Sequence, residues 1–209
     1  MADYLFADRT DAGGVLAAEL TAWRGADAVV CGIPRGGVVV GAAVAEALDL
    51  PLDVAIVRKL GATTNEEFAV GAIAEGVRVV RPDAVQLAGM GPEQLDFVED
   101  MERVELRRRT ALFAGSRAEL TGRTAIVVDD GIATGSTAIA ACKTVRTRGA
   151  AQVVLATPVA PLGWRPARDI ADEYICAVAA SDFWAVGQFY RDFTQTTDAE
   201  VVALLERRR

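Results

Sequence analysis

Short apolar runs rich in β-branched residues alternate along the chain with longer segments whose apolar residues recur every three or four positions. The short runs predict strands, and the longer segments predict helices. The predicted strands are Ala28–Ile33, Leu52–Val57, Phe68–Ala74, Thr124–Val128, Gln152–Thr157 and Tyr174–Val178. The predicted helices are Gly14–Trp23, Gly37–Leu48, Pro92–Ala114, Ser136–Arg148 and Trp164–Ala171. This repeated order is typical of an α/β fold built on a parallel sheet.

Two polar segments interrupt this order. Residues Arg58–Glu67 join two strand-like runs, contain Gly61, and are predicted to form a mobile loop over a site. Residues Pro92–Arg117 form a predicted helix whose acidic half precedes its basic half, an order that suits the helix dipole. Such a helix is usually a solvated outer helix, and self-association through its surface is compatible with any of the functions considered below.

Composition narrows the class of protein. The 209 residues are 52% hydrophobic and 24% charged, which predicts a single domain with a sizeable core. The net charge of −7 repels polyanions, so neither nucleic acid nor an acidic membrane surface is an expected partner. No apolar run reaches the roughly 18 residues that span a membrane, and the N-terminal residues do not resemble a secretion signal. A cytoplasmic location is therefore predicted.

The absence of histidine removes several kinds of catalyst. Without histidine, the chain has no Ser-His or Cys-His nucleophile, and a zinc site is not expected. The three cysteines, Cys31, Cys142 and Cys176, are widely spaced among apolar neighbours. They are predicted to be core residues and not disulfide partners or metal ligands.

The segment Ala125–Thr137, AIVVDDGIATGST, carries the strongest chemical signal. An apolar strand ends in Asp129 and Asp130, and a loop of small residues then opens a helix, where backbone N–H groups and hydroxyls can hold a phosphate. The adjacent carboxylates would repel that phosphate, so they suit the hydroxyls of a sugar or a hydrated Mg²⁺. A phosphate beside a diol indicates a ribose 5-phosphate.

This segment resembles the signature of the type I phosphoribosyltransferases. The resemblance implies that Asp129 and Asp130 contact the ribose hydroxyls of phosphoribosyl pyrophosphate (PRPP), with Mg²⁺ held near them through water or the ligand. It also implies a single-domain parallel-sheet fold with a small C-terminal hood. The residues implied to bind the 5-phosphate are Ala133, Thr134, Gly135, Ser136 and Thr137.

Two further loops follow predicted strands. The loop CGIPRGG combines two glycines with a guanidinium, which suits an anion, although a plain strand-to-helix turn is the alternative. In the resembled family this loop binds pyrophosphate, which assigns that role to Pro34, Arg35, Gly36 and Gly37 and implies a cis peptide bond between Pro34 and Arg35. The pair Arg58 and Lys59 resembles the cations that neutralise pyrophosphate in adenine-type enzymes, with a solvated loop as the alternative.

The tail Ser181–Phe193 is rich in aromatic residues. These rings either close the core or form a hood over the site, where Phe183, Trp184 or Tyr190 would contact a planar base. The hood is expected to comprise residues 181–194 together with the N-terminal segment, and the core residues 26–180. The YRDF sequence resembles the tail of hypoxanthine-type enzymes, which assigns Arg191 to pyrophosphate.

The resemblance runs from about Val29 to Arg191 and is closest to predicted phosphoribosyltransferases of undetermined substrate that carry a PRGG loop. It implies Mg²⁺-dependent transfer of a phosphoribosyl group from PRPP to a nitrogenous small-molecule acceptor, with release of pyrophosphate. It also implies that the protein is a homodimer or a larger homo-oligomer. Ala133 stands where 6-oxopurine enzymes have aspartate, which disfavours those bases. Glu66, Glu67 and Asp182 stay open as the general base. The alternative function is a non-catalytic regulator that binds PRPP or a nucleotide.

Overall fold

A parallel five-stranded sheet forms the centre of the computed structural model, which describes residues 4–207 except for the side chains of Glu67 and Ser116. Its strand order is β2-β1-β6-β7-β8, and every neighbouring pair is parallel. The strands are β1 (Ala28–Gly32), β2 (Leu52–Val54), β6 (Thr124–Val128), β7 (Gln152–Pro161) and β8 (Glu173–Ala180). The predicted α/β class and parallel sheet are therefore confirmed.

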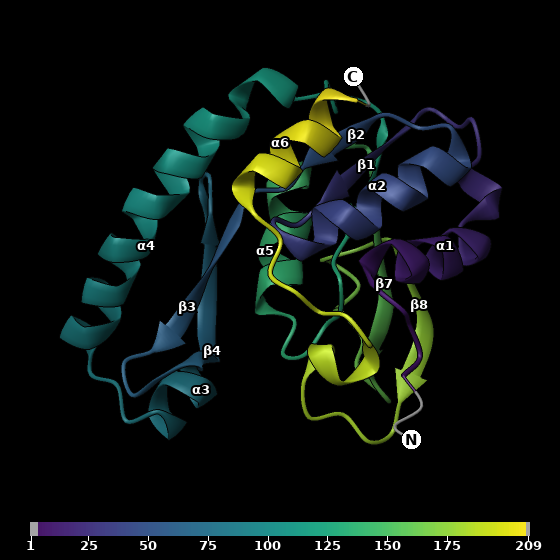
Figure 1. The fold of residues 1–209 in the computed structure, drawn as a ribbon. Coiled ribbons are helices and arrows are strands. Elements are labelled where there is room, and N and C mark those ends of the chain that lie inside the picture. Colours follow the sequence, from purple (N-terminus) through teal and green to yellow (C-terminus); the bar gives the residue numbers. More distant parts are fainter. Residues whose placement is uncertain (1–3, 208–209) are drawn as a thin grey trace.

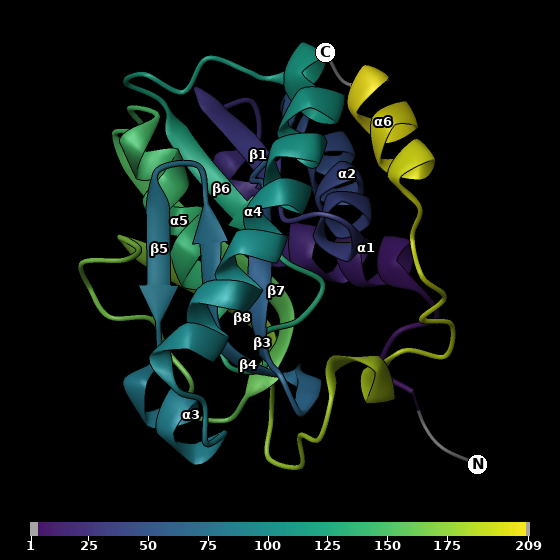
Figure 2. The same cartoon turned by 90° about the vertical axis from the view of Figure 1, so that its left-hand side faces the viewer.

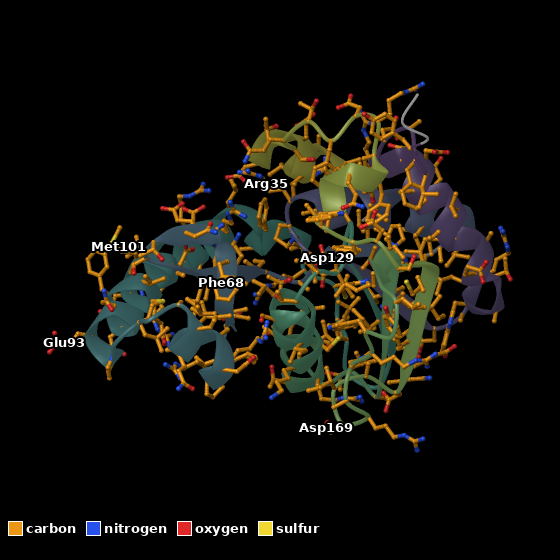
Figure 3. All side chains as sticks on the ribbon, turned by 90° about the horizontal axis from the view of Figure 1, so that it is seen from below. Arg35, Phe68, Glu93, Met101, Asp129 and Asp169 are labelled. Atoms are coloured by element: carbon orange, nitrogen blue, oxygen red, sulfur yellow. The ribbon has the colours of Figure 1, made fainter. Side chains whose placement is uncertain are left out.

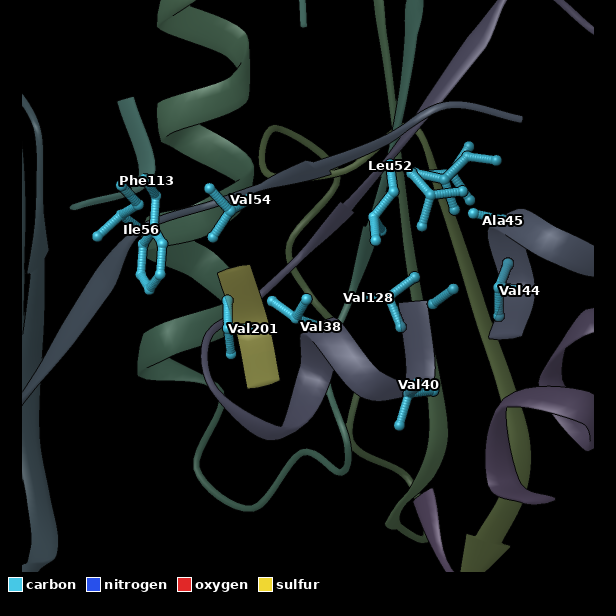
Figure 4. Packing of buried hydrophobic residues seen from close by; sticks show 14 of the residues in the cluster. Val38, Val40, Val44, Ala45, Leu52, Val54, Ile56, Phe113, Val128 and Val201 are labelled. Carbon is cyan, nitrogen blue, oxygen red and sulfur yellow. The ribbon is translucent and has the colours of Figure 1, made fainter. Parts of the chain in front are cut away.

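Helices cover both faces of this sheet (Figure 1). Helices α1 (Arg9–Glu19) and α2 (Gly36–Leu48) lie on one face, and α5 (Ser136–Thr147) lies on the other. Because successive strand residues point to opposite faces, Val30 and Ile126 join the core under α1 and α2, whereas Val29 and Val127 join the core under α5. Figure 4 shows Val38, Val40 and Val44 of α2 in the first of these cores, together with Leu52 and Val128 of the sheet.

A second sheet stands beside the first. It is antiparallel, in the order β3-β4-β5, and consists of β3 (Val57–Ala62), β4 (Asn65–Ala74) and β5 (Val77–Val80). Helices α3 (Pro82–Leu87) and α4 (Pro92–Phe113) follow it, and α4 packs against β3 and β4 (Figure 1). The predicted loop conformation of Arg58–Glu67 is therefore wrong, because these residues form most of a β-hairpin whose turn is at residues 63 and 64. The mobility of this segment over a site stays a prediction.

Two other predictions differ from the structure. The expected helix Trp164–Ala171 is absent, and these residues form turns and irregular chain. Pro166 disfavours a helical conformation at Arg165, which removes the start of the predicted helix. The first helix begins at Arg9 instead of Gly14, because the side chain of Asp8 caps it by accepting hydrogen bonds from the amides of Thr10 and Asp11.

The chain ends form a third small core. Phe6 pairs with Tyr190, and the amides of Leu5 and Phe6 both donate to the carbonyl of Phe189, at 3.0 and 2.9 Å. Helix α6 (Asp198–Glu206) packs on α2 and β2. Among the described residues, the other short elements are the 3₁₀ segments Thr21–Trp23, Ala114–Ser116 and Val186–Phe189. The N-terminal segment and residues 181–194 thus lie together, and their role as a hood over the site stays a prediction.

The cysteines lie as predicted. Cys31 and Cys142 are buried, Cys176 is half-buried, and none of the three forms a disulfide. Burial raises the pKa of the Cys142 thiol to about 12. Within residues 4–207, no helix combines the length and the apolar character that a membrane span requires.

Candidate functional site

A cavity of about 730 Å³ lies where the loops after β1 and β6 meet the hairpin and the tail. The carboxyl ends of parallel strands are the usual ligand site of an open α/β sheet. Twelve of the predicted site residues line the cavity: Pro34, Arg35, Gly36, Lys59, Asp129, Asp130, Ala133, Thr134, Gly135, Ser136, Thr137 and Trp184. Five others do not line it: Gly37, Arg58, Phe183, Tyr190 and Arg191.

The PRGG loop packs directly on the end of β6. The Pro34–Arg35 peptide bond is cis, as predicted. A Cβ atom on Gly37 would lie 2.6 Å from the carbonyl oxygen of Val128 and 2.9 Å from Cα of Asp129, so only glycine allows this approach. Gly37 therefore brings the guanidinium-bearing loop and the two aspartates to the same cavity without lining it.

Asp129 and Asp130 form an adjacent pair of carboxylates, of which Asp129 is buried and Asp130 is half-buried. Burial and the neighbouring charge of Asp130 raise the pKa of Asp129 well above its ordinary value, although Thr137 donates a hydrogen bond to its side chain. Burial also raises the pKa of Asp130, and the nearby Arg9 guanidinium opposes this effect. The pair therefore favours ligand groups that reduce its charge repulsion, which are hydroxyl donors or a cation. Figure 3 shows Asp129 in the middle of the molecule, between the hairpin side and the tail.

The loop before α5 presents helix-start donors to the same cavity. Gly135 caps α5 with φ of +82°, a left-handed conformation that favours glycine. The hydroxyl oxygen of Ser136 is buried and has no hydrogen-bond partner among the described residues. A buried hydroxyl without a partner costs free energy, and a phosphate oxygen would satisfy it along with the first amides of the helix.

Arg9 is a site residue that the sequence analysis missed. Its Nε atom donates to Oδ2 of Asp130 at 2.8 Å, and its Nη1 atom donates to the carbonyl of Thr194 at 2.8 Å. Its guanidinium carbon lies 3.9 Å from the centre of the Phe193 ring, a cation–π contact. Arg9 therefore links helix α1, the tail and the acidic pair. Nothing around Arg9 in the sequence marks it, since Asp130 is 121 positions away.

Strand geometry separates Arg58 from Lys59. Neighbouring strand residues point to opposite faces, so Lys59 lines the cavity whereas Arg58 points to α4 and pairs with Glu102 at 2.5 Å. The expectation that both cations serve the site is corrected here for Arg58. A loop, as predicted from the sequence, would not have imposed this alternation.

Of the three aromatic residues predicted to contact a base, one lines the cavity and two do not. Trp184 lines the cavity and is 85% exposed, so its ring is available to a ligand. Tyr190 is buried and its ring packs at a tilt against Phe6, with ring centres 5.2 Å apart. Its hydroxyl group donates to the backbone carbonyl of Asp130 at 2.5 Å, so Tyr190 supports the acidic pair instead of lining the cavity. Phe183 packs against Phe189, which likewise keeps it in the hood core.

The remaining candidates lie outside the cavity. Arg191 is exposed and does not line the cavity, and its backbone amide donates to the carbonyl of Phe6. Its role towards pyrophosphate stays a prediction. Glu66 and Asp182 are exposed and do not line the cavity, and the side chain of Glu67 lies outside the described part of the chain. In contrast, Gln195 and Thr196 of the tail line the cavity although the sequence analysis did not single them out.

Arg35 has an acidic neighbour from the C-terminal helix. Its Nη1 atom lies 3.9 Å from Oδ1 of Asp198, the first residue of α6. That oxygen is buried and accepts no hydrogen bond among the described residues, while the other carboxylate oxygen accepts one from Arg108 of α4. Asp198 therefore connects the PRGG loop to α4.

Comparison with known proteins identifies the family. A family model described as the phosphoribosyl transferase domain matches residues 10–194. A Mycobacterium tuberculosis H37Rv protein named "Putative phosphoribosyl transferase Rv0571c" is 50% identical over 213 residues, which cover 97% of this chain and 47% of that protein. The crystal structure of TT1426 from Thermus thermophilus is 38% identical, with a TM-score of 0.74, and the match covers 97% of this chain and 98% of that one.

The chain therefore belongs to the phosphoribosyl transferase domain family. An adenine phosphoribosyltransferase of Kineococcus radiotolerans is also similar, at 36% identity over 116 residues, which cover 51% of this chain and 62% of that enzyme. The chain spans about half the length of the M. tuberculosis relative. Arg9 lies just before the residues that the family model matches.

Proposed function

We propose that the protein transfers the 5-phosphoribosyl group of PRPP to a nitrogen nucleophile and releases pyrophosphate. One observation carries this proposal: a single cavity combines the adjacent carboxylates Asp129 and Asp130, a helix-start loop with a Ser136 hydroxyl that has no partner among the described residues, and a loop that carries Arg35. These three parts match the diol, the phosphate and the pyrophosphate of one molecule. The family membership supports the same reaction class.

The reaction breaks the bond between C1 of the ribose and the pyrophosphate oxygen, and it forms a bond between C1 and the acceptor nitrogen, whose proton is released to water. The electron pair of the broken bond leaves with pyrophosphate, so positive charge develops on the sugar, as in other glycosyl transfers. Asp129 and Asp130 hold the ribose hydroxyls, and Ala133 to Thr137 hold the 5-phosphate. Arg35 and Lys59 line the cavity and stabilise the charge that develops on the leaving group.

The family implies Mg²⁺, and the residues present are suited to it. Two carboxylates with raised pKa values supply oxygen ligands that a divalent cation prefers. Two side chains cannot fill an octahedral shell, so water and the pyrophosphate of the substrate would supply the other ligands. When bound, Mg²⁺ supplies charge neutralisation to the leaving pyrophosphate.

The acceptor we propose is a planar nitrogenous base of the adenine type. Trp184 offers an exposed ring at the cavity, and aromatic rings stack well on bases. Ala133 lacks the carboxylate that the 6-oxopurine enzymes are expected to have there. The similarity to an adenine phosphoribosyltransferase points in the same direction. The cytoplasmic location and the absence of a nucleic-acid partner stay predictions.

Calorimetric titration tests the proposal. PRPP with Mg²⁺ is titrated into the protein, and pyrophosphate release is then assayed with a panel of free bases. We expect binding, and release with an adenine-type base. Binding without release for every base would contradict transfer and favour the PRPP-binding regulator, and a lack of binding would refute the ribose phosphate site itself.

Matched variants locate the site. The double substitution Asp129→Asn and Asp130→Asn is expected to abolish PRPP binding while the protein stays folded. It removes the repulsion between the two carboxylates, which offsets part of the loss of the Arg9–Asp130 ion pair. Lys59→Gln is expected to weaken PRPP binding about tenfold, which is the typical value of one charge-assisted contact. Lys143→Gln, which changes the only other lysine, is the control, because Lys143 lies on α5 away from this cavity.

A further inference from the structure

Helix α4 leaves an apolar row uncovered. Phe97, Met101 and Val104 recur at the spacing of one helix face and are 65%, 60% and 57% exposed, and Arg108, which pairs with Glu105 and Asp198, ends the row. The opposite face of α4 packs on β3 and β4. In Figure 2 no other element lies in front of α4, and Figure 3 shows Met101 and Glu93 at the outer edge of the molecule, far from Asp129. Exposed rows of large apolar residues commonly mark interaction surfaces.

The charges beside this row are divided by sign. Glu93, Asp96 and Asp100 are exposed on the N-terminal half of α4, and Arg107 is exposed on the C-terminal half. None of these four forms an ion pair with another described residue. The remaining acids of α4 do form such pairs: Glu99 with Arg78 and Arg103, Glu102 with Arg58, and Glu105 with Arg108 and Arg109. The unpaired charges are therefore those that flank the apolar row.

We infer that this face of α4 binds the same face of a second copy of the chain, with the two helices antiparallel. Asp96 and Arg107 lie about 16 Å apart along the helix axis, and Met101 lies near their midpoint. A twofold axis there places Asp96 of each copy opposite Arg107 of the other, Met101 against Met101, and Phe97 towards Val104. Antiparallel packing pairs the acidic half with the basic half, whereas parallel packing would oppose like charges.

The separation of acidic and basic residues along α4 also favours a second copy of the chain over other binding partners. A partner of one charge sign, such as a polyanion or a basic peptide, would be repelled by one half of the face. A second copy carries the same two halves and presents them in reverse order. The 22-residue helix is about 33 Å long, which limits the contact to a small interface and predicts a Kd of about 1–100 µM.

Sedimentation equilibrium of the 209-residue chain tests this inference. We expect a reversible monomer–dimer equilibrium in the micromolar range. Asp96→Arg and Arg107→Asp should each weaken the dimer at least about tenfold, because each places like charges opposite each other twice. The combined variant Asp96→Arg/Arg107→Asp should restore the dimer to within about threefold of the original Kd, since the charges again oppose with opposite sign.

Recovery in the combined variant cannot result from damage to the fold, which makes this readout specific. Met101→Glu should also dissociate the dimer, because it places two charges against each other at the axis. Glu19→Arg, the same acid-to-arginine change on the exposed side of α1, is the control and should leave the Kd unchanged. A chain that stays monomeric at about 200 µM, a dimer that none of the α4 changes weakens, or a combined variant without recovery would overturn the inference.

Discussion

Asp130 is held by two residues that come from opposite ends of the chain. Arg9 donates to its carboxylate at 2.8 Å, and Tyr190 donates to its backbone carbonyl at 2.5 Å. Neither contact uses the Oδ1 atom, which leaves that carboxylate oxygen available to a ligand hydroxyl. The position of one carboxylate at the site therefore depends on the hood as well as on the strand that carries it.

Gly36 is the residue that gives Arg9 and Asp130 room to meet. A Cβ atom there would lie 2.6 Å from Nε of Arg9 and would also collide with the carboxylate of Asp130. We expect Gly36→Ala to lower PRPP affinity at least about tenfold and to lower the free energy of unfolding by about 1–2 kcal/mol, because the ion pair must shift. Calorimetry and urea denaturation measure the two quantities.

Gly14→Ala is the control for this change. Gly14 lies in α1, and a Cβ atom there meets nothing within 4 Å. Alanine should raise the free energy of unfolding by about 0.5–1 kcal/mol through its better helix propensity and leave PRPP affinity unchanged. Normal PRPP affinity in Gly36→Ala would show that the Arg9–Asp130 pair does not shape the ribose site.

Trp184 and Tyr190 should respond differently to substitution. Trp184→Ala is expected to raise KM for the acceptor about fivefold or more, since base stacking contributes about 1 kcal/mol or more, and to change stability by less than about 0.5 kcal/mol. Tyr190→Phe is expected to lower the free energy of unfolding by about 1–2 kcal/mol, because it leaves the Asp130 carbonyl without its donor. Its acceptor KM should stay unchanged, and the opposite pattern would assign the base contact to Tyr190.

At the scale of elements, local signals predicted most of the fold. The strand Thr124–Val128 and the start of the following helix at Ser136 were predicted at the residues observed, since the apolar run, the acids and the glycine all act within a few positions. The position of the PRGG loop between a strand and a helix was predicted in the same way, whereas its cis bond was implied by the family resemblance. These two segments contain most of the site, which explains why most of the predicted residues line the cavity.

The elements that the sequence did not predict are those stabilised by distant contacts. The β3–β4 hairpin contains polar, small residues and turns at Thr63 and Thr64, without the glycine or asparagine that commonly marks a tight turn. Its strands are held by α4 and α5, which follow later in the chain. The position of Arg9 depends in the same way on Asp130, and the separate directions of Arg58 and Lys59 follow from the unpredicted strand.

Glu105 offers a test of how α4 is stabilised. Hydrogen bonds from Arg108 and Arg109 lower the pKa of its carboxyl from 4.5 to about 2, and Arg109 is buried. Because the pKa of Glu105 is lower in the folded state, its charge stabilises the folded protein. This stabilisation is fully present above pH 4.5 and is lost as the pH falls towards 2. We expect Glu105→Gln to lower the free energy of unfolding by about 1–2 kcal/mol at pH 7, since it leaves Arg109 without its acid.

The difference between the original protein and Glu105→Gln should shrink as pH falls from 4.5 towards 2, which urea denaturation at several pH values would show. Asp100→Asn is the control, because Asp100 is exposed on the same helix beyond its first turn and has no ion pair with a described residue. A stability difference that does not change over this pH range would contradict the role of the Glu105 charge.

At the scale of the whole molecule, the site depends on both ends of the chain. Arg9 precedes the residues that the family model matches, and Asp198, which neighbours Arg35, follows them. The chain ends thus contact the two loops that hold the proposed ribose and pyrophosphate groups. Because a ligand that binds only the folded state stabilises all of it, thermal unfolding reports on this site without knowledge of the acceptor.

PRPP with Mg²⁺ at about 100 times its Kd should add about 2.7 kcal/mol to the free energy of unfolding, which corresponds to a rise in Tm of roughly 5–10 °C for a domain of this size. The Asp129→Asn/Asp130→Asn variant should lose this rise. Inorganic phosphate should give a smaller rise that the variant keeps, because the proposed phosphate site is the Ser136 loop and the carboxylates only repel phosphate. If the variant lost both rises, the two aspartates would be needed to shape the phosphate loop; if it kept both, they would not bind the ribose.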